Sequence, residues 1–165
     1  MIKTENFNFE PFNLENNLHK ELAIELTTNS KSSFVKQVED RIRISKENAL
    51  FGNSFAIFCD NMPIGYLYIS SKPKDYIFIE YLLTKNARGK HYGRQMLLEI
   101  EEYLFTNNTD LKEIRLDIDN SNIASQKIAE FNGYYADEEE LDFLTNPTSL
   151  TYKKFNPYYK KEHKR

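Results

Sequence analysis

A short basic segment, residues 88–93, has the composition of a phosphate-binding turn. It contains two glycines, Gly89 and Gly93, and the basic side chains in and just after it are Arg88, Lys90 and Arg94. An apolar run precedes the segment and an amphipathic stretch, residues 92–105, follows it. A strand, a tight turn and a helix in this order direct backbone N–H groups and the positive end of a helix at one point. The segment therefore predicts a site for a phosphate-bearing cofactor.

Two well-known phosphate sites fit this segment poorly. The chain lacks the Gly-Lys-Ser/Thr sequence that closes a P-loop. The strand–helix unit also lacks a compelling acidic residue for a ribose, which argues against a Rossmann dinucleotide site. A plain structural turn stays an alternative interpretation, and so does a nucleotide-binding protein of another type.

A second polar segment, residues 119–125, follows a run in which apolar and charged residues alternate. Its sequence is Asp-Asn-Ser-Asn-Ile-Ala-Ser. Side chains of these types cap helices, and capping alone is one explanation of the segment. The short periodic stretch after it stops at Asn132-Gly133, a pair typical of a helix C-terminus.

Hydrophobic periodicity places both segments in a mixed α/β sheet. Helical spacing predicts helices over residues 14–27, 32–48 and 92–105, and a short one that ends at residue 131. The expected buried positions are Leu14, Leu18, Leu22 and Leu26; Met96, Leu97, Ile100 and Leu104; and Ala124, Ile128 and Phe131. On the third helix, solvent-facing positions are expected for Glu99, Glu101 and Glu102.

Strand-like runs alternate with these helices. They cover residues 2–9, 55–59, 64–70, 75–83, 114–118 and 149–155. The runs over residues 55–59, 64–70 and 75–83 are expected to pair antiparallel, because short turn sequences connect them. The strand–helix–strand unit from residue 76 to 118 predicts one parallel pair with a right-handed crossover.

Composition excludes several classes of function. The net charge of −3 gives no electrostatic basis for binding nucleic acid or a membrane. The single cysteine, Cys59, excludes an intrachain disulfide and is expected to be a small buried hydrophobe. His19 and His163 lack partners at metal-ligand spacing, so we expect no metal site and surface positions for both.

The length of 165 residues suits one domain, expected over residues 1–155, followed by a basic tail over residues 156–165. The tail is either solvated or an interaction segment. The chain has no signal-peptide pattern and no apolar run long enough to span a membrane. These features predict a cytoplasmic protein.

Together, the two polar segments resemble the GNAT superfamily of acyl-CoA-dependent N-acyltransferases. The family pattern for the diphosphate loop, Arg/Gln-x-x-Gly-x-Gly/Ala, matches residues 88–93. The downstream pattern, Asn-x-x-Ser before a short helix that ends in Gly-Phe, matches Asn122, Ser125 and then Gly133-Tyr134. This second pattern is most similar to the branch of ribosomal-protein and aminoglycoside acetyltransferases. The likeness covers about residues 54–136.

The resemblance implies a mixed, mostly antiparallel sheet flanked by helices, with splayed central parallel strands that hold acetyl-CoA. One strand amide, at Leu82 or Leu83, would polarise the thioester carbonyl. The cofactor-binding residues implied in this way are Leu82, Leu83, Arg88, Gly89, Lys90, His91, Tyr92, Gly93, Arg94, Asn122 and Ser125. His91 stands where the family usually has glycine. Its side chain would either crowd the diphosphate or donate to a phosphate oxygen.

Two further residues are candidates for catalysis. Glu80 is the charged residue of an otherwise apolar strand. It is either solvated or faces the cleft, where it would bind or deprotonate the acceptor amine, directly or through a water. Many family members have a tyrosine general acid at the position of Ala129. Tyr134 is the candidate replacement, with Tyr135 and Tyr81 as alternatives, although a thiolate can leave without an acid.

These residues predict an N-acetyltransferase that moves an acetyl group from acetyl-CoA to a primary amine by direct attack in a ternary complex. The acceptor is a small-molecule or peptide amine, and the acidic balance weakly favours a cationic one. A dimer is possible. The alternative is a non-catalytic acyl-CoA-binding sensor or scaffold, which His91 and Ala129 favour.

Overall fold

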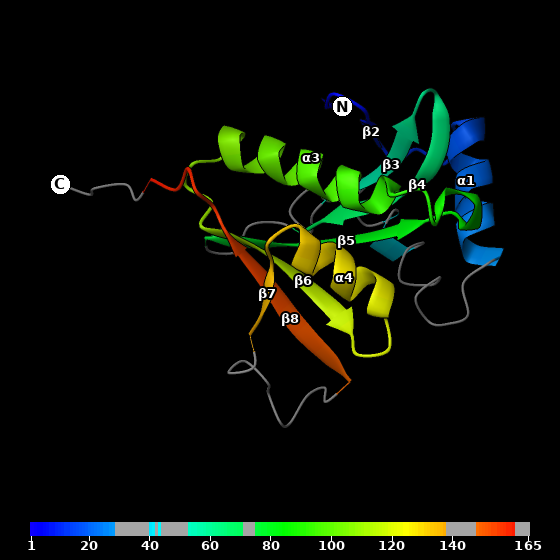
Figure 1. Cartoon of the computed structure of the whole chain (residues 1–165). Coiled ribbons are helices and arrows are strands. Elements are labelled where there is room, and N and C mark those ends of the chain that lie inside the picture. The colour runs from blue at the N-terminus through cyan, green and yellow to red at the C-terminus, as the bar shows by residue number, and fades with distance from the viewer. Residues whose placement is uncertain (29–39, 42, 44–52, 71–74, 138–147, 161–165) are drawn as a thin grey trace.

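The computed structural model describes residues 1–28, 40, 41, 43, 53–70, 75–137 and 148–160 (Figure 1). Its helices are α1 (Asn17–Thr28), α3 (Tyr92–Asn107) and α4 (Ile123–Phe131), with a short 3-10 turn, η2 (Lys85–Ala87). Its strands are β1 (Ile2–Lys3), β2 (Asn8–Pro11), β3 (Asn53–Cys59), β4 (Met62–Ile69), β5 (Tyr76–Leu83), β6 (Glu113–Asp119), β7 (Tyr135–Ala136) and β8 (Ser149–Phe155).

The strands form one sheet in the order β1-β2-β3-β4-β5-β6-β8-β7. Neighbouring strands run antiparallel except β5 and β6, which are parallel. This arrangement confirms the predicted mixed α/β fold and its parallel pair. The β3–β4 hairpin turns at Asp60 and Asn61, whose φ angles of 50° and 64° suit a two-residue hairpin loop.

Apolar clusters fill both faces of this sheet, because successive residues of a strand point to opposite faces. In β3, Phe55 and Ile57 join the cluster that includes the buried face of α3. Ala56 and Phe58 instead join a smaller cluster with Leu22 of α1. Helices α3 and α1 therefore cover opposite faces.

Strands β5 and β6 separate after a short paired stretch. Residues 76–78 pair with residues 113–115, and no further pairing joins the two strands within the described ranges. Beyond that point β5 continues to Leu83 paired with β4, and Figure 1 shows β5 and β6 diverging. The strands are splayed, as the resemblance implied.

The buried face of α1 differs in part from the prediction. Leu22 and Leu26 are buried, but Leu14 and Leu18 are 46% and 48% exposed. Leu14 lies before the helix, which begins at Asn17. The helix start is fixed by Asn16, whose side-chain oxygen accepts the N–H of Leu18 at 2.9 Å, so Leu18 lies in the first turn of α1.

Three other side chains depart from their predicted positions. Ala124, expected in the core, is exposed in the first turn of α4. Glu101, expected to face solvent, is 2% exposed because it forms an ion pair with Lys154 of β8. Phe131, expected in the core, is 63% exposed. Hydrophobic periodicity thus fails at Glu101, where an ion pair allows burial, and at Phe131, whose exposed ring contacts the guanidinium of Arg94. Cys59 is half-buried at the end of β3.

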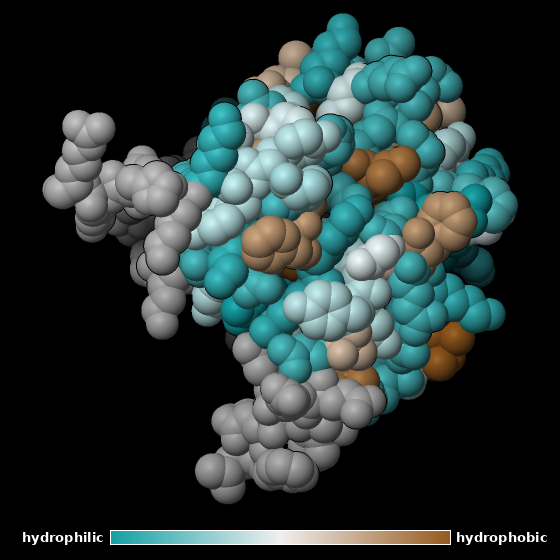
Figure 2. Space-filling view, turned by 60° about the vertical axis from the view of Figure 1, so that its left-hand side comes forward, coloured by the Kyte–Doolittle hydropathy of each residue, from teal (hydrophilic) through white to brown (hydrophobic). Residues whose placement is uncertain are grey.

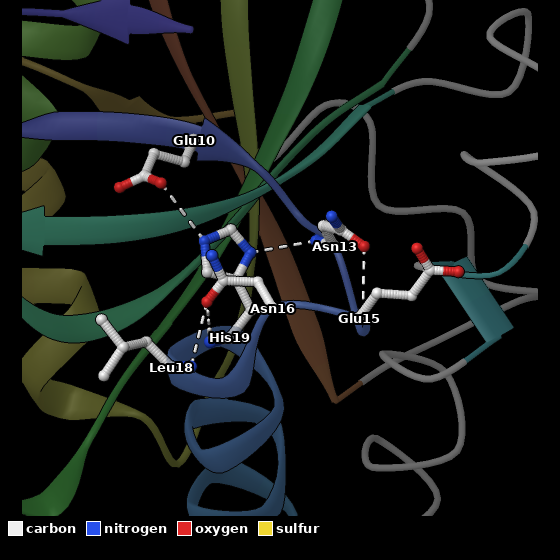
Figure 3. Close-up of polar contacts among 6 residues, drawn as sticks. All are labelled: Glu10, Asn13, Glu15, Asn16, Leu18 and His19. Carbon is white, nitrogen blue, oxygen red and sulfur yellow. Dashed lines mark hydrogen bonds and ion pairs between the residues drawn. The ribbon is translucent and has the colours of Figure 1, made fainter.

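His19 is buried, which corrects the expected surface position. Figure 3 shows its ring between the start of α1 and β2. Its Nδ1 accepts the N–H of Asn13 at 3.0 Å, so the proton lies on Nε2, which faces Glu10 Oε1 at 3.4 Å. The ring also packs against Phe12 and Phe58, with centroid distances of 5.4 Å and 5.6 Å. His19 thus fastens α1 to the sheet, whereas His163 lies outside the described residues.

Packing continues past the expected domain boundary at residue 155. The Asn156 side chain is fully buried and donates to the Leu111 carbonyl at 2.7 Å, and the Tyr158 hydroxyl donates to Glu102 at 2.9 Å. The last part of the predicted tail, residues 161–165, lies outside the described residues. Most of the helix predicted over residues 32–48 also lies outside the described residues. Of this range, residues 40, 41 and 43 are described, and they are helical.

The surface in Figure 2 is mainly hydrophilic, with apolar side chains in separate spots. In the part of the chain that the structure describes, no helix has the length and apolar character needed to cross a membrane.

Candidate functional site

The basic segment forms a tight loop between η2 and α3. Gly89 has a φ of 76°, and His91, the N-cap residue of α3, has φ 62° and ψ 12°. Both values lie in the left-handed region, where glycine is favoured and other residues are strained. Apart from Gly89 and its two chain neighbours, no heavy atom of the described residues lies within 4 Å of a Cβ built at this position, so the backbone of Gly89 is open on that side. The backbone here can approach a ligand closely.

The first turn of α3 is left uncapped. The His91 side chain makes no capping hydrogen bond, and the first turn contains no acidic residue. The first helical hydrogen bond runs from Gln95 N–H to the His91 carbonyl at 3.2 Å. Within the described ranges, the N–H groups of Tyr92, Gly93 and Arg94 donate to no protein acceptor. These three donors and the positive end of the helix face the loop, as an anion site requires.

Gly93 has a packing role in addition to its place in the loop. A Cβ on Gly93 would lie 3.1 Å from Cδ1 of Ile128 in α4 and 3.3 Å from Cδ1 of Leu83 in β5. The glycine therefore allows α3 to lie against both elements. A substitution at this position would disturb the core together with any binding site.

The predicted basic residues differ in their surroundings. Arg88 and Lys90 are exposed on the loop. Arg94 lies over the ring of Phe131, with its guanidinium carbon 3.8 Å from the ring centroid. Its backbone carbonyl accepts from the Asn132 side chain at 3.2 Å. Arg94 is thus fixed against the end of α4, whereas Arg88 and Lys90 are available to a ligand above the loop.

The second predicted motif forms the start of α4. The Asn122 side-chain oxygen accepts the N–H of Ser125 at 3.2 Å, so Asn122 acts as a helix cap in this structure. Ser125 is half-buried, and its hydroxyl lies near that of Tyr81 on β5. Burial raises the pKa of Tyr81, and the nearby Ser125 hydroxyl opposes that rise. The motif thus links α4 to the open side of β5.

The register of β5 decides which backbone groups face the gap between the splayed strands. The Ser70 N–H donates to the Phe78 carbonyl and the Thr84 N–H donates to the Ile64 carbonyl, both at 2.9 Å. The backbone groups of Phe78 and Thr84 therefore form their hydrogen bonds on the β4 side of β5. The pairing between β4 and β5 is regular from Ile79 to Leu83.

Backbone groups of successive residues alternate between the two neighbours of a strand. Leu82 therefore directs its groups toward β4, and a Cβ on Gly65 of β4 would lie only 2.5 Å from the Leu82 carbonyl oxygen. Tyr81 and Leu83 direct theirs toward the side that β6 has left. Of the two amides predicted to polarise a thioester, the register favours Leu83.

Glu80 lies on the opposite face of β5 from Tyr81. Both of its carboxylate oxygens accept from the guanidinium of Arg41, one of them at 3.2 Å. The guanidinium carbon of Arg41 also lies 4.4 Å from the ring centroid of Tyr68 on β4. Burial lowers the pKa of Arg41, but the Glu80 contact outweighs that effect and raises it, so the guanidinium stays charged. Sequence reasoning missed Arg41, which lies 39 residues from Glu80.

Tyr134, the candidate general acid, is 4% exposed. Burial and the neighbouring Glu101 carboxylate raise the pKa of Tyr134 well above 10. In the described part of the chain, the hydroxyls of Tyr134 and Tyr81 and one Glu101 oxygen have no hydrogen-bond partner of normal geometry. Ala129, at the position where the resemblance implies a tyrosine acid in many relatives, is fully buried. Tyr134 thus remains protonated beside a buried carboxylate, and its catalytic role stays a prediction.

The conformation of His91 gives a first testable prediction. Glycine avoids the left-handed cost of about 1–2 kcal/mol but loses about 0.5–1 kcal/mol through chain entropy. We therefore expect the His91→Gly variant to be more stable than the His91→Ala variant. Its free energy of unfolding, measured in urea, should be higher by about 0.5–1 kcal/mol. Because the His91 side chain is exposed, we expect both variants to bind CoA, the cofactor that the sequence resemblance implies, within about threefold of wild type. A loss of about tenfold in both would show that the imidazole contacts the ligand.

Across the described residues, no group of three or more His, Cys, Asp or Glu side chains is arranged to hold a metal ion.

Comparison with known proteins relates this geometry to a family. A model of the acetyltransferase (GNAT) domain matches residues 18–135. No curated protein sequence gives a significant match.

Among solved structures, the chain is similar to RimL, a ribosomal L7/L12 α-N-protein acetyltransferase in complex with coenzyme A. The identity is 15% and the TM-score 0.67, over 92% of this chain and 95% of that one. It is also similar to a ribosomal-protein-S5-alanine acetyltransferase from Vibrio fischeri (15% identity, TM-score 0.67, 97% and 98% covered). A third is the Campylobacter jejuni N-acetyltransferase PseH in complex with acetyl coenzyme A (14% identity, TM-score 0.68, 90% and 98% covered). At these identities the three share the fold.

Proposed function

Because the chain belongs to the GNAT acetyltransferase family, we propose that it transfers an acetyl group from acetyl-CoA to a primary amine within a ternary complex. One observation carries the proposal: the uncapped start of α3 adjoins a β5 edge that β6 has left open. CoA or acetyl-CoA is bound in two of the similar structures, which supports the same donor here.

The residues present fit an acyl-CoA. The N–H groups of Tyr92, Gly93 and Arg94 would hold the diphosphate, with Arg88 and Lys90 adding positive charge. The open backbone groups of β5 suit an arm that contains amides, because they can pair with it as a neighbouring strand would. The thioester supplies an acetyl group that is already activated for transfer. The Leu83 N–H is the donor for its carbonyl oxygen, where negative charge develops.

Glu80 would hold the acceptor ammonium and accept one of its protons, directly or through a water. The amine nitrogen then bonds to the acetyl carbon while the C–S bond breaks, and the sulfur takes up a proton. The products are an amide, the CoA thiol and, counted from the ammonium, one released proton. This scheme needs no covalent enzyme intermediate.

The acceptor class is proposed from the similar proteins. Two of them are named as ribosomal-protein acetyltransferases, which supports a peptide or protein amine, with a small-molecule amine as the alternative. Thiol release from acetyl-CoA with a panel of peptides and amines, together with calorimetric CoA binding, tests the proposal. Acceptor-dependent thiol release is expected. Binding of CoA without turnover on any amine would instead favour the sensor or scaffold function, and no CoA binding would exclude both.

Tyr134→Phe tests the predicted general acid. The hydroxyl lies beside Glu101 inside the core, so we expect kcat to stay within about threefold of wild type. Removing an unpaired buried hydroxyl should leave the free energy of unfolding unchanged or raise it by about 1 kcal/mol. Steady-state kinetics and urea unfolding measure the two effects. A fall in kcat of about 100-fold, at unchanged stability, would establish Tyr134 as the acid.

A further inference from the structure

The Arg41–Glu80 pair is a two-charge site that solvent can reach. The guanidinium donates to both oxygens of the carboxylate, and the side chains of Arg41 and Glu80 are 26% and 27% exposed. The ring of Tyr68 forms a wall beside the guanidinium. A fork-shaped pair of this kind presents one cationic and one anionic group in fixed positions.

The pair lies where an acceptor would have to approach. Glu80 is paired with Tyr68 across β4 and β5, and the next residue on that face, Leu82, packs with the α1 cluster. The pair is therefore on the α1 face of the sheet. It also lies on the part of β5 beyond residue 78, where β6 has separated. The start of α3, proposed to bind the diphosphate, is on the other face. An acceptor that enters from the α1 face meets Arg41 and Glu80 at the gap between the strands.

The charges of the pair constrain what binds there. Arg41 and Glu80 together are neutral, so a simple ammonium gains little attraction and brings a second cation next to Arg41. A ligand with both an ammonium and a carboxylate avoids this repulsion. Its ammonium can bond to Glu80 while its carboxylate bonds to Arg41, which replaces one ion pair by two in the same partly buried site.

We propose that the acceptor is a primary amine with a carboxylate close to it, with the amine on Glu80 and the carboxylate on Arg41. This inference rests on the proposed acetyltransferase function and narrows its acceptor. Two sources supply this chemistry: the α-carboxylate of a free amino acid, or the acidic side chain of the first residue of a peptide. Arg41 is then a specificity-determining residue.

Matched acceptor pairs test the proposal. One arm compares α-amino acids with the amines that decarboxylation would give, such as methionine and 3-(methylthio)propylamine. The other arm compares C-terminally amidated peptides that begin with Asp or Glu with those that begin with Asn or Gln. Thiol release with saturating acetyl-CoA gives kcat/KM for each member. We expect at least a tenfold advantage for the carboxylated member in one arm, and that arm identifies the source.

Variants of Arg41 show whether this residue sets the preference. Arg41→Gln should reduce the advantage at least tenfold and leave the KM for acetyl-CoA unchanged, while Arg41→Lys should keep part of it. Arg43→Gln is the matched control, because Arg43 is 67% exposed and pairs with Asp40 instead. Thermal unfolding of each variant confirms that it is folded.

These experiments test the proposed acceptor preference separately from the proposed acetyltransferase function. Equal rates within both arms, a preference for the decarboxylated amines, or an advantage that Arg41→Gln leaves intact would overturn the inference while the acetyltransferase function stands. If no amine is turned over, the enzyme function fails. Calorimetric binding of both members to the CoA-bound protein then tests recognition alone, and equal or absent binding overturns the inference.

Discussion

The double variant Arg88→Glu/Lys90→Glu is expected to bind CoA about 100-fold more weakly than wild type. Both side chains are exposed on the loop before α3, so reversing their charge places two carboxylates beside the proposed diphosphate without disturbing the core. Each lost charge-assisted contact is worth about 1.5 kcal/mol, and two give about 3 kcal/mol. Isothermal titration calorimetry measures the dissociation constant.

The control for this variant is Lys20→Glu, which reverses an exposed charge on α1, on the other face of the sheet. It should bind CoA as wild type does. The loss at the loop should also shrink as salt is raised, because the contacts are exposed to solvent. Unchanged affinity in the double variant would show that CoA, if it binds at all, is held elsewhere.

Glu80→Gln is expected to lower kcat/KM about 100-fold with little change in CoA affinity. The amide has nearly the shape of the carboxylate but neither its charge nor its ability to take a proton, so it cannot hold or deprotonate an ammonium. It also leaves the Arg41 guanidinium without its anionic partner. Steady-state thiol release across a range of pH, with CoA binding measured alongside, gives both quantities.

Glu21→Gln, on the exposed side of α1, is the matched control and should behave as wild type. Wild-type rates in Glu80→Gln at every pH would remove Glu80 from the mechanism and leave it a structural partner of Arg41. A parallel loss of CoA affinity would indicate a disturbed sheet and not a lost catalytic group.

Much of the cofactor half of the site could be predicted from the sequence, because its determinants are local. Gly89 and the periodicity after residue 92 define the loop and the helix. The alternation of Ile114, Leu116 and Ile118 defines the strand that pairs with the start of β5. Each of these signals operates over a few neighbouring residues, where periodicity and turn chemistry are informative.

The acceptor half of the site depends on contacts between distant segments. Arg41 reaches Glu80 across 39 residues, and nothing in the periodicity around either residue indicates the pair. Glu101 is buried because Lys154, 53 residues away, neutralises it. The choice between Leu82 and Leu83 depends on the phase of the β4–β5 register, which hydrophobic pattern alone does not supply in a strand that is apolar on both faces.

The central claim is that the free N–H groups at the start of α3 bind the diphosphate of CoA. The most direct measurement is a titration of the ¹⁵N-labelled protein with CoA, followed by ¹H–¹⁵N correlation spectra. The account predicts saturable shifts of the Tyr92, Gly93 and Arg94 amides at one common dissociation constant, with the Lys20 amide unmoved. Amides at the start of α3 that stay unshifted at millimolar CoA would contradict it.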